Sequence, residues 1–274
     1  AFQAMTVADY ARRIGAHAIA HGSTGAGNDQ VRFDYFIHVM APEIQLIAPI
    51  RELRISRKEE MDYLKNLGFE FSWEKSRYSI NQGIWGTSIG GAETLSSLGE
   101  LPEEAYPVQC TKTGTEVLTI GFSGGEPISL NGIAMDPLQV IEKIHEIAAP
   151  YGIGRDIHVG DTIIGLKGRV GFEAAAPMIL IHAHHLLEKH VLGKWQLYWK
   201  EQLANWYGMM LHEAQYLDPV MRNIEDFLEN TQKRVTGEVS VRLHPRTFTL
   251  AGCTSPFDLM NPAFGQYGEG TAAF

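Results

Sequence analysis

The chain has 274 residues, 45% of them hydrophobic and 20% charged, and these proportions exclude disorder as its main state. Its formal net charge of −9 argues against non-specific nucleic-acid binding, which needs a basic surface. Cys110 and Cys253 are the only cysteines and form no CxxC pair. A disulfide framework and a structural zinc site are therefore disfavoured, and the low cysteine count fits a protein of the reducing cytoplasm.

The first part of the chain alternates between helical and strand patterns. Its first helix is predicted by a stripe of side chains at helical spacing: Phe2, Met5, Thr6, Tyr10 and Ile14. Residues 16–20 and 44–49 predict short strands, and residues 28–40 between them have helical spacing. A capping box, Ser-Arg-Lys-Glu, opens a helix predicted over residues 56–68, where a glycine ends it. This order of strands and helices predicts a parallel sheet with crossover helices.

The remainder of the chain has a different pattern, which predicts an α+β domain after a boundary near residues 70–76. Hairpins are predicted over residues 116–130, with a Gly-Gly turn, and over residues 239–250, with a turn near His244-Pro245. Between these hairpins, residues 152–171 carry six glycines. That density predicts tight turns and close backbone approach rather than a regular long strand.

Four helices are expected in this second part. An Asp-Pro pair caps the helix over residues 136–148, and a second Asp-Pro pair opens another at Asp218. Residues 177–190 predict a buried helix. A stripe predicts the fourth, a long helix with core or subunit contacts: Trp195, Trp199, Leu203, Trp206 and Met210.

The most apolar stretch, residues 174–187, does not predict a membrane span. Pro177 and three histidines interrupt it, and it falls short of the roughly 18 apolar residues that a span needs. The chain start has no signal-peptide pattern. The three histidines are His182, His184 and His185, and His190 follows shortly after the stretch. No Asp or Glu completes an HExxH-type motif, so a mixture of core and surface histidines is favoured over a metal site.

The strongest functional feature is the glycine-rich segment 22–33, GSTGAGNDQVRF, which joins a short strand to a helix. The free N–H groups and positive dipole end of such a helix suit an anion, although an ordinary helix cap has the same pattern. Neither GxGxxG nor a Walker A loop fits. Asp29 and Arg32 share a helix face, which suits a zwitterion such as an amino acid, or forms an ordinary surface ion pair.

Two further segments carry weaker signals. In residues 78–91, Ser79 and Ser88 lie among glycines and are suited to orienting a small polar ligand, although serines are common in loops. In the glycine-rich segment after residue 152, charged residues form either the wall of a site or solvated turns. These residues are Arg155, Asp156, Asp161, Lys167, Arg169 and Glu173.

Four segments together resemble the argininosuccinate synthase family, in its Bacteroidetes-like type. They are HGSTGAGNDQVRF, YSINQGIWGTS, YGIGRDIHVGDTIIGLKGR and LANWYGMMLHEAQYLDPV. They cover almost the whole chain in the family's order, and the first is highly specific. The resemblance implies an α/β fold with part of a parallel-sheet nucleotide-binding domain of the ATP-pyrophosphatase (adenine nucleotide alpha hydrolase-like) type over residues 1–72. Residues 73–274 would then form an α+β synthetase domain for substrate binding and oligomerisation.

The resemblance also implies a reaction. The family is a ligase of arginine biosynthesis that joins citrulline to aspartate through a citrullyl-adenylate, using ATP with Mg²⁺ and releasing AMP and pyrophosphate. It implies a cytoplasmic homotetramer without nucleic-acid or membrane partners, and it assigns neither a catalytic residue nor a protein-held metal. The implied aspartate-binding residues are Thr24, Asn28 and Asp29. The implied citrulline-binding residues are Asn28, Arg32, Ser79 and Ser88. The implied ATP-binding residues are Ala20, His21, Gly22, Gly25 and Gly27.

Several positions depart from the family pattern. Gly160, followed by Asp161, stands where many members have a citrulline-binding Glu; Phe172 replaces a Tyr; and Ala26 replaces a Lys. The SGGxDTS pyrophosphate loop is absent, and so is the terminal helix that follows GQYGEGTAAF in the family. We therefore expect a cropped chain that is inactive as written. A non-catalytic amino-acid-binding or assembly module is the alternative function, and a thiolation-type ligase is disfavoured because no catalytic cysteine motif occurs.

Overall fold

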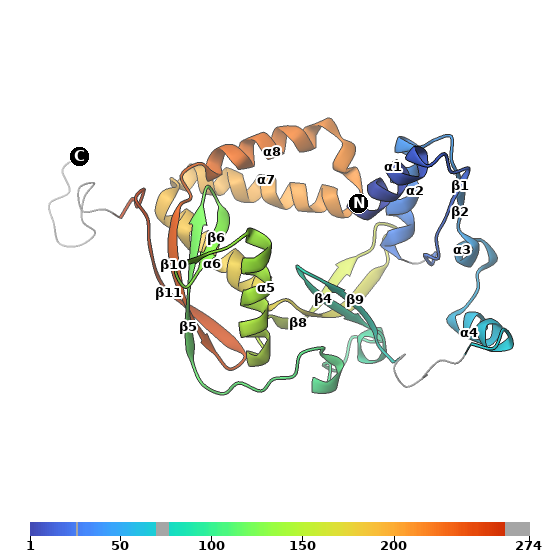
Figure 1. Ribbon diagram of the computed structural model, residues 1–274, viewed down its shortest axis with the longest axis horizontal. Coiled ribbons are helices and arrows are strands. Elements are labelled where there is room, and N and C mark those ends of the chain that lie inside the picture. The colour runs from blue at the N-terminus through green and yellow to red at the C-terminus, as the bar shows by residue number, and fades with distance from the viewer. Residues whose placement is uncertain (26, 70–76, 261–274) are drawn as a thin grey trace. The chain divides into compact units, whose positions relative to one another are not determined.

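The computed structural model describes residues 1–25, 27–69 and 77–260 (Figure 1). The chain forms two compact units. Unit 1 contains Ala1–Ser76, Val159–Gly168 and Ala204–Ile224, and unit 2 contains Arg77–His158, Arg169–Leu203 and Glu225–Phe274. The chain therefore passes between the units several times. The expected boundary near residues 70–76 lies outside the described residues.

Unit 1 contains the predicted parallel sheet. Strands β1 (Ala18–Ala20) and β2 (Gln45–Ile47) pair in parallel, and helix α2 (Asn28–Met40) connects them. A capping box opens helix α4 (Arg57–Asn66), as predicted, while the short helix α3 (Pro49–Leu53) was not expected. The strand-helix-strand order thus gives the crossover arrangement that the apolar pattern indicates.

Helix α1 (Phe2–Arg13) forms as predicted, but the large side chains of its apolar stripe contribute little of its packing surface, apart from Met5 and a ring contact of Phe2. Ala4, Ala8 and Ala11 are its buried residues, whereas Phe2 and Tyr10 are about 60% exposed. Alanines bring α1 close to α2, so small side chains rather than large ones form this contact.

Unit 2 is built on an antiparallel sheet with the strand order β11-β10-β5-β6-β7. Its strands are β5 (Glu116–Ser123), β6 (Glu126–Leu130), β7 (Ile133–Ala134), β10 (Gly237–His244) and β11 (Thr247–Thr254). Both predicted hairpins are present. Gly124 and Gly125 form the first turn with φ of 58° and 86°, where side chains other than glycine are strained.

Two helices pack on this sheet (Figure 1). Helix α5 (Pro137–Ala148) has the predicted Asp136 capping box, and α6 (Ala175–Val191) is the predicted buried helix. Their apolar faces and the inner sheet face form the main core, in which Ile120, Ile144 and Ile179 are fully buried.

A second sheet has the order β3-β4-β9-β8. Its strands are β3 (Ser79–Gly83), β4 (Gly86–Gly90), β8 (Arg155–Asp161) and β9 (Lys167–Glu173). The expectation of tight turns rather than a regular long strand is therefore wrong for residues 155–161 and 167–173, while the expected turns are present at residues 152–154 and 163–165. Glycine occurs in these strands partly because neighbours approach closely: a Cβ at Gly171 would lie 2.0 Å from Leu101 Cδ1.

The remaining helices are α7 (Lys194–His212) and α8 (Pro219–Gln232). Short 3₁₀ turns cover Ala92–Leu95, Glu103–Ala105, Ala149–Tyr151 and Gln215–Leu217. No side chain of α7 is buried, and Trp195 and Trp206 are more than 60% exposed. The core interpretation of the tryptophan stripe is thus wrong for this chain, and its subunit interpretation stays a prediction.

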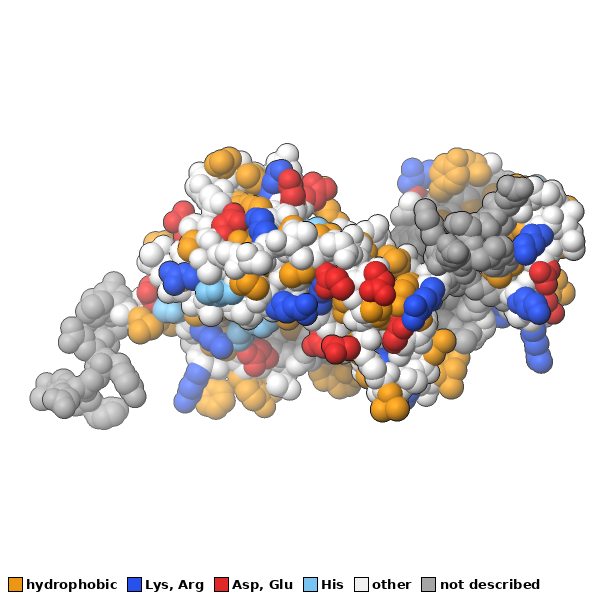
Figure 2. Space-filling model, turned by 90° about the horizontal axis from the view of Figure 1, so that it is seen from below, with side chains coloured by type: hydrophobic (Ala, Val, Ile, Leu, Met, Phe, Trp, Pro, Cys, Tyr) orange, Lys and Arg blue, Asp and Glu red, His pale blue; other side chains and the backbone are white. Residues whose placement is uncertain are grey.

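Charged side chains of both signs are interspersed on the face drawn in Figure 2. Among the described residues, no helix combines the length and the apolar character needed to cross a membrane.

Candidate functional site

The glycine-rich loop lies between the end of β1 and the first turn of α2, as the sequence predicts. Gly27 is the N-cap of α2 and has no side chain to cap it, so the first N–H groups of the helix are left for another acceptor. Asp29 lies in that first turn. The end of α2 therefore offers donors and a positive dipole to an anion, with a carboxylate beside them.

Three side chains that the sequence analysis did not single out, Gln30, Arg51 and Asp34, stabilise this loop through hydrogen bonds and an ion pair. Gln30, which is buried, donates its amide to the Gly25 carbonyl, and Arg51 Nη1 donates to Gln30 Oε1 at 3.2 Å. Arg51 also pairs with Asp34 at 2.6 Å. Gln30 and Asp34 are four residues apart on one helix face, which the sequence does show. Arg51 comes from another element, and no local pattern points to it.

His21 begins the loop and is buried against the same group. Its Nδ1 accepts a hydrogen bond from the Ser23 N–H at 3.2 Å, so its proton is on Nε2. That Nε2 lies 3.6 Å from Asp34 Oδ1, and the ring stacks on Phe33. These contacts fix the direction in which the chain leaves β1.

A cavity of about 490 Å³ opens beside the loop. Thr24, Gly25, Gln30, Arg51 and Arg54 are among its lining residues. Two arginine side chains therefore line a cavity that also includes part of the glycine-rich loop. Such a set of donors suits phosphate or carboxylate oxygens.

Asn28 and Arg32 are fixed by other segments of unit 1. Asn28 Oδ1 accepts from the Ile163 N–H at 2.8 Å, and its Nδ2 donates to His212 Nε2 at 3.2 Å. Arg32 donates through Nε and Nη2 to the His212 carbonyl, at 3.2 and 3.1 Å. The C-terminal end of α7 thus takes two of the five donors of Arg32.

The predicted pair of Asp29 and Arg32 is present, with 3.3 Å between Asp29 Oδ1 and Arg32 Nη1. The Asp29 side chain is 74% exposed, and that of Arg32 is 24% exposed. The Asp29 carboxylate is therefore accessible to a cationic group from solution. Arg32, by contrast, also binds the C-terminal end of α7 through the His212 carbonyl. The structure thus contains the ordinary ion pair, and the zwitterion site stays a prediction.

Ser79 and Ser88 belong to unit 2 and lie on neighbouring strands rather than in loops. The register pairs Ser79 with Gly90 and Asn81 with Ser88, so the two serines share one face of the hairpin. Phe172 of β9 pairs directly with Ser88 and lies on that face too. Sequence spacing gave no indication of this arrangement, because it depends on strand register.

The charged residues of the glycine-rich segment divide between the two alternatives: Arg155 and Asp156 line a cavity of about 720 Å³, whereas Asp161 and Lys167 are exposed on either side of a turn. Arg155 is 8% exposed and contacts Glu173 at 3.1 Å and Glu103 at 2.8 Å. Burial raises the pKa of the Glu173 carboxyl, although the Arg155 guanidinium opposes this. Arg169 donates to four carbonyls of the segment 93–99.

Asp161, next to Gly160, pairs with Lys167 at 2.6 Å in unit 1, and both side chains are mostly exposed. A ligand ammonium would compete with Lys167 for that carboxylate. Ala26 lies outside the described residues. No group of three His, Cys, Asp or Glu side chains within residues 1–25, 27–69 and 77–260 is arranged to hold a metal ion.

Comparisons with known proteins agree with the motifs. Residues 2–70 match the Arginosuccinate synthase N-terminal HUP domain, and residues 78–273 match the Arginosuccinate synthase C-terminal domain. The chain is 38% identical over 268 residues to the argininosuccinate synthase of Methanocaldococcus jannaschii, covering 96% of this chain and 67% of that protein. It is 36% identical over 264 residues to that of Dictyoglomus thermophilum, covering 95% and 66%. The chain thus spans about two thirds of these relatives.

Proposed function

The chain belongs to the argininosuccinate synthase family, and from this premise we propose that it serves the ATP-dependent joining of citrulline and aspartate in arginine biosynthesis. In the proposed reaction the citrulline ureido oxygen bonds to the α-phosphorus of ATP, and pyrophosphate leaves. The aspartate amine then bonds to the ureido carbon of this citrullyl-adenylate, and AMP leaves. Residues 1–72 are proposed to belong to the nucleotide-binding domain and residues 73–274 to the synthetase domain.

The observation that carries this proposal is the glycine-rich loop at the uncapped N-terminus of α2, with arginines beside it. The free N–H groups and guanidinium donors have the chemistry that a nucleotide phosphate needs. We assign the loop from Ala20 to Gly27, including His21, Gly22 and Gly25, to ATP. Mg²⁺ is assigned to the phosphates and to no protein side chain. The catalytic contribution of the protein is then positioning and charge stabilisation.

We propose that the amino-acid substrates bind to polar side chains in the loop, in the first turns of α2 and on the β3–β4 hairpin. Thr24, Asn28 and the exposed Asp29 carboxylate are proposed for aspartate, whose ammonium Asp29 attracts. Asn28 and Arg32 are proposed for the polar groups of citrulline, with Arg32 directed at its carboxylate. Ser79 and Ser88 share one face and are proposed to bind its remaining polar atoms. A cytoplasmic homotetramer is proposed as the working state by family resemblance.

The test is AMP release by the full-length protein in the presence of ATP, citrulline and aspartate. Release that requires both amino acids is expected, and its absence would refute the proposal. Asp29→Asn is expected to raise the KM for aspartate about tenfold or more, because a charged hydrogen bond is lost, with little change for citrulline. Asp62→Asn on exposed α4 is the matched control and should leave both KM values unchanged.

A non-catalytic amino-acid-binding or assembly module is the second candidate, because the exposed Asp29 carboxylate and the Arg32 guanidinium lie together as a zwitterion would need. Isothermal titration with citrulline and aspartate, with and without a non-hydrolysable ATP analogue, separates the two functions. Binding that depends on the analogue supports the ligase. Binding that is indifferent to it supports the module.

A further inference from the structure

Arg51 reaches the glycine-rich loop from outside it, because it belongs to the short helix α3 that follows β2. Its Nη1 donates to two acceptors on α2, Gln30 Oε1 at 3.2 Å and Asp34 Oδ2 at 2.6 Å. Its aliphatic part lies close to the loop as well, since a Cβ built on Gly25 would be 3.7 Å from Arg51 Cγ. One side chain thus approaches both the loop and the helix that follows the loop.

Gln30 connects Arg51 to the backbone of the loop. This side chain is buried, and it donates its Nε2 to the Gly25 carbonyl while its Oε1 accepts from Arg51. An amide has a donor on one side and an acceptor on the other, so the Arg51 contact selects the orientation in which Nε2 is directed at Gly25. Removal of Arg51 removes the donor that holds this orientation, and the Gly25 carbonyl then loses its fixed partner.

The second acceptor of Arg51 leads to the loop less directly. Asp34 Oδ1 is 3.6 Å from His21 Nε2, which is longer than a hydrogen bond. Both of these atoms are buried, and neither has a hydrogen-bond partner within the described part of the chain. The continuous hydrogen-bonded path from Arg51 to the loop therefore passes through Gln30.

The orientation of the Gly25 peptide group affects how the loop binds a ligand. A glycine-rich loop binds phosphate through N–H groups in a fixed arrangement. Glycine loses more conformational entropy on ordering than any other residue, so a loop that is ordered before binding loses less on binding. A side chain that orders the loop can therefore raise its affinity for a nucleotide without touching the nucleotide.

We propose that Arg51 is a positioning residue for the nucleotide, and that it acts through Gln30 on the Gly25 carbonyl. This inference rests on the proposed assignment of the loop to ATP. Direct attraction of a phosphate by the Arg51 guanidinium is the competing role, since Arg51 also lines the cavity beside the loop. The two roles differ in a measurable way, because positioning requires Gln30 and charge attraction does not.

The test is a double-mutant cycle in the full-length protein, in which isothermal titration gives the Kd of a non-hydrolysable ATP analogue. Arg51→Met and Gln30→Met each keep an unbranched stem and remove the hydrogen bonds. Each is expected to raise the Kd about tenfold, and the double variant about tenfold as well, because both changes break the same path. Effects that multiply to about a hundredfold, or an unchanged Kd in either single variant, would overturn the proposal.

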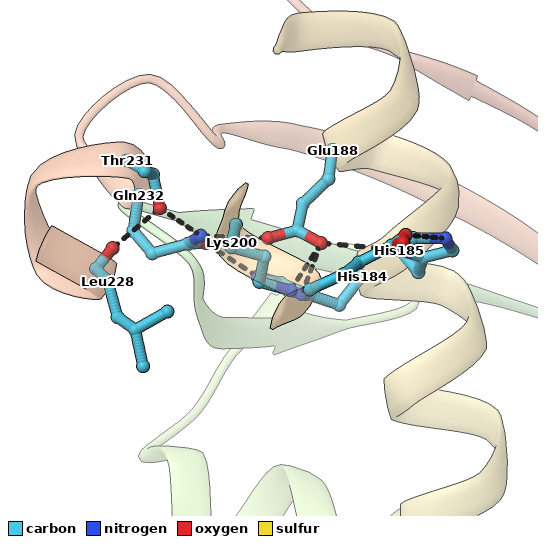
Figure 3. Close-up of polar contacts among 8 residues, drawn as sticks. His184, His185, Glu188, Lys200, Leu228, Thr231 and Gln232 are labelled. Atoms are coloured by element: carbon cyan, nitrogen blue, oxygen red, sulfur yellow. Dashed lines mark hydrogen bonds and ion pairs between the residues drawn. The ribbon is translucent and has the colours of Figure 1, made fainter. Parts of the chain in front are cut away.

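A matched control lies in unit 2, where Figure 3 shows Lys200 and Gln232 directed at the Glu188 carboxylate. Glu188 is 0% exposed, and Lys200 donates to it at 2.7 Å. Lys200→Met therefore removes the cation of a hydrogen-bonded ion pair, as Arg51→Met does. It should lower the free energy of unfolding in urea and leave the Kd of the analogue unchanged. An equal rise of the Kd in Lys200→Met would assign the Arg51 effect to lost stability and overturn the proposal.

AMP release separates this inference from the proposed function. A native protein that neither binds the analogue nor releases AMP refutes the proposed function, and positioning with it. A native protein that releases AMP, while the effects of Arg51→Met and Gln30→Met multiply, refutes positioning alone. If Arg51→Met does not fold, Arg51→Lys replaces it in the cycle with the same expected pattern, because lysine keeps the charge without the rigid fork of donors.

Discussion

At the residue scale, arginines hold main-chain segments together in the described part of the chain. Arg32 donates to the carbonyl that ends α7, Arg169 to the carbonyls of the segment 93–99, and Arg155 to the Val108 carbonyl. A guanidinium suits this task because it has five donors in a rigid plane and stays ionised. Arg155 and Arg169, which the sequence suggests as possible residues of a site wall, therefore bind main-chain carbonyls within the protein.

The buried Arg155 and Glu173 pair gives the first stability prediction. Arg155→Met leaves the carboxylate of Glu173, which is 1% exposed, without this partner, so the free energy of unfolding should fall by about 3–5 kcal/mol. Arg13→Met removes an exposed pair with Asp9 and should cost no more than about 1 kcal/mol. Urea denaturation measures both. Equal losses would show that burial of the Arg155 pair has no energetic consequence.

A second prediction concerns pH. The pKa of Glu173 is raised in the folded state above its ordinary value of 4.5, so the folded protein binds this proton more tightly than the unfolded chain. The stability from this proton is present below about pH 4.5 and is lost as pH rises through the raised pKa. Glu173→Gln cannot ionise, so its stability relative to the native protein should increase from pH 4 to pH 7. Parallel stability curves in denaturant titrations at each pH would contradict this.

At the scale of elements, local capping signals fix where several helices begin. The Asp136 side chain accepts from the Leu138 N–H at 2.9 Å, and Gln139 reaches back to the Asp136 N–H at 3.2 Å. The same reciprocal pattern occurs at Ser56 and Glu59. Both boundaries follow from the sequence because a capping box spans only four residues.

The Asp136 cap gives a prediction at this scale. Asp136→Ala should lower the free energy of unfolding by about 1 kcal/mol, since the first turn of α5 loses an acceptor for its N–H groups. Asp62→Ala, in the body of exposed α4, removes the same side chain without a cap and should stay within about 0.5 kcal/mol. Thermal unfolding followed by circular dichroism compares the two. Equal losses of stability in the two variants would show that the helix cap is not the cause of the Asp136→Ala effect.

At the scale of the whole molecule, each compact unit has its own core. Phe36 and Ile37 are fully buried in unit 1, while the larger core of unit 2 joins the sheet to α5 and α6. The proposed substrate residues are divided between the units: the loop, Asn28, Asp29 and Arg32 lie in unit 1, and Ser79 and Ser88 lie in unit 2. Segments 159–168 and 204–224, which lie far along the chain, also belong to unit 1. A single boundary in the sequence therefore cannot separate the two units.

The sequence by itself determined the features that depend on neighbouring residues. The glycine-rich loop, the range of α2, both capping boxes, the Gly-Gly hairpin and the family all follow from short motifs. Turn and cap chemistry acts over a few residues, so it can be recognised without any knowledge of the fold.

Tertiary structure alone decided the features that depend on distant partners. It selected chiefly alanines rather than the large side chains of the apolar stripe for the packing of α1, made strands of residues 155–161 and 167–173, and left the tryptophans of α7 exposed. It also linked Arg51 to Gln30 and placed Glu188 among Lys200 and Gln232. Burial and long-range hydrogen bonding depend on which surfaces meet in space, and the spacing of residues along one segment does not contain that information.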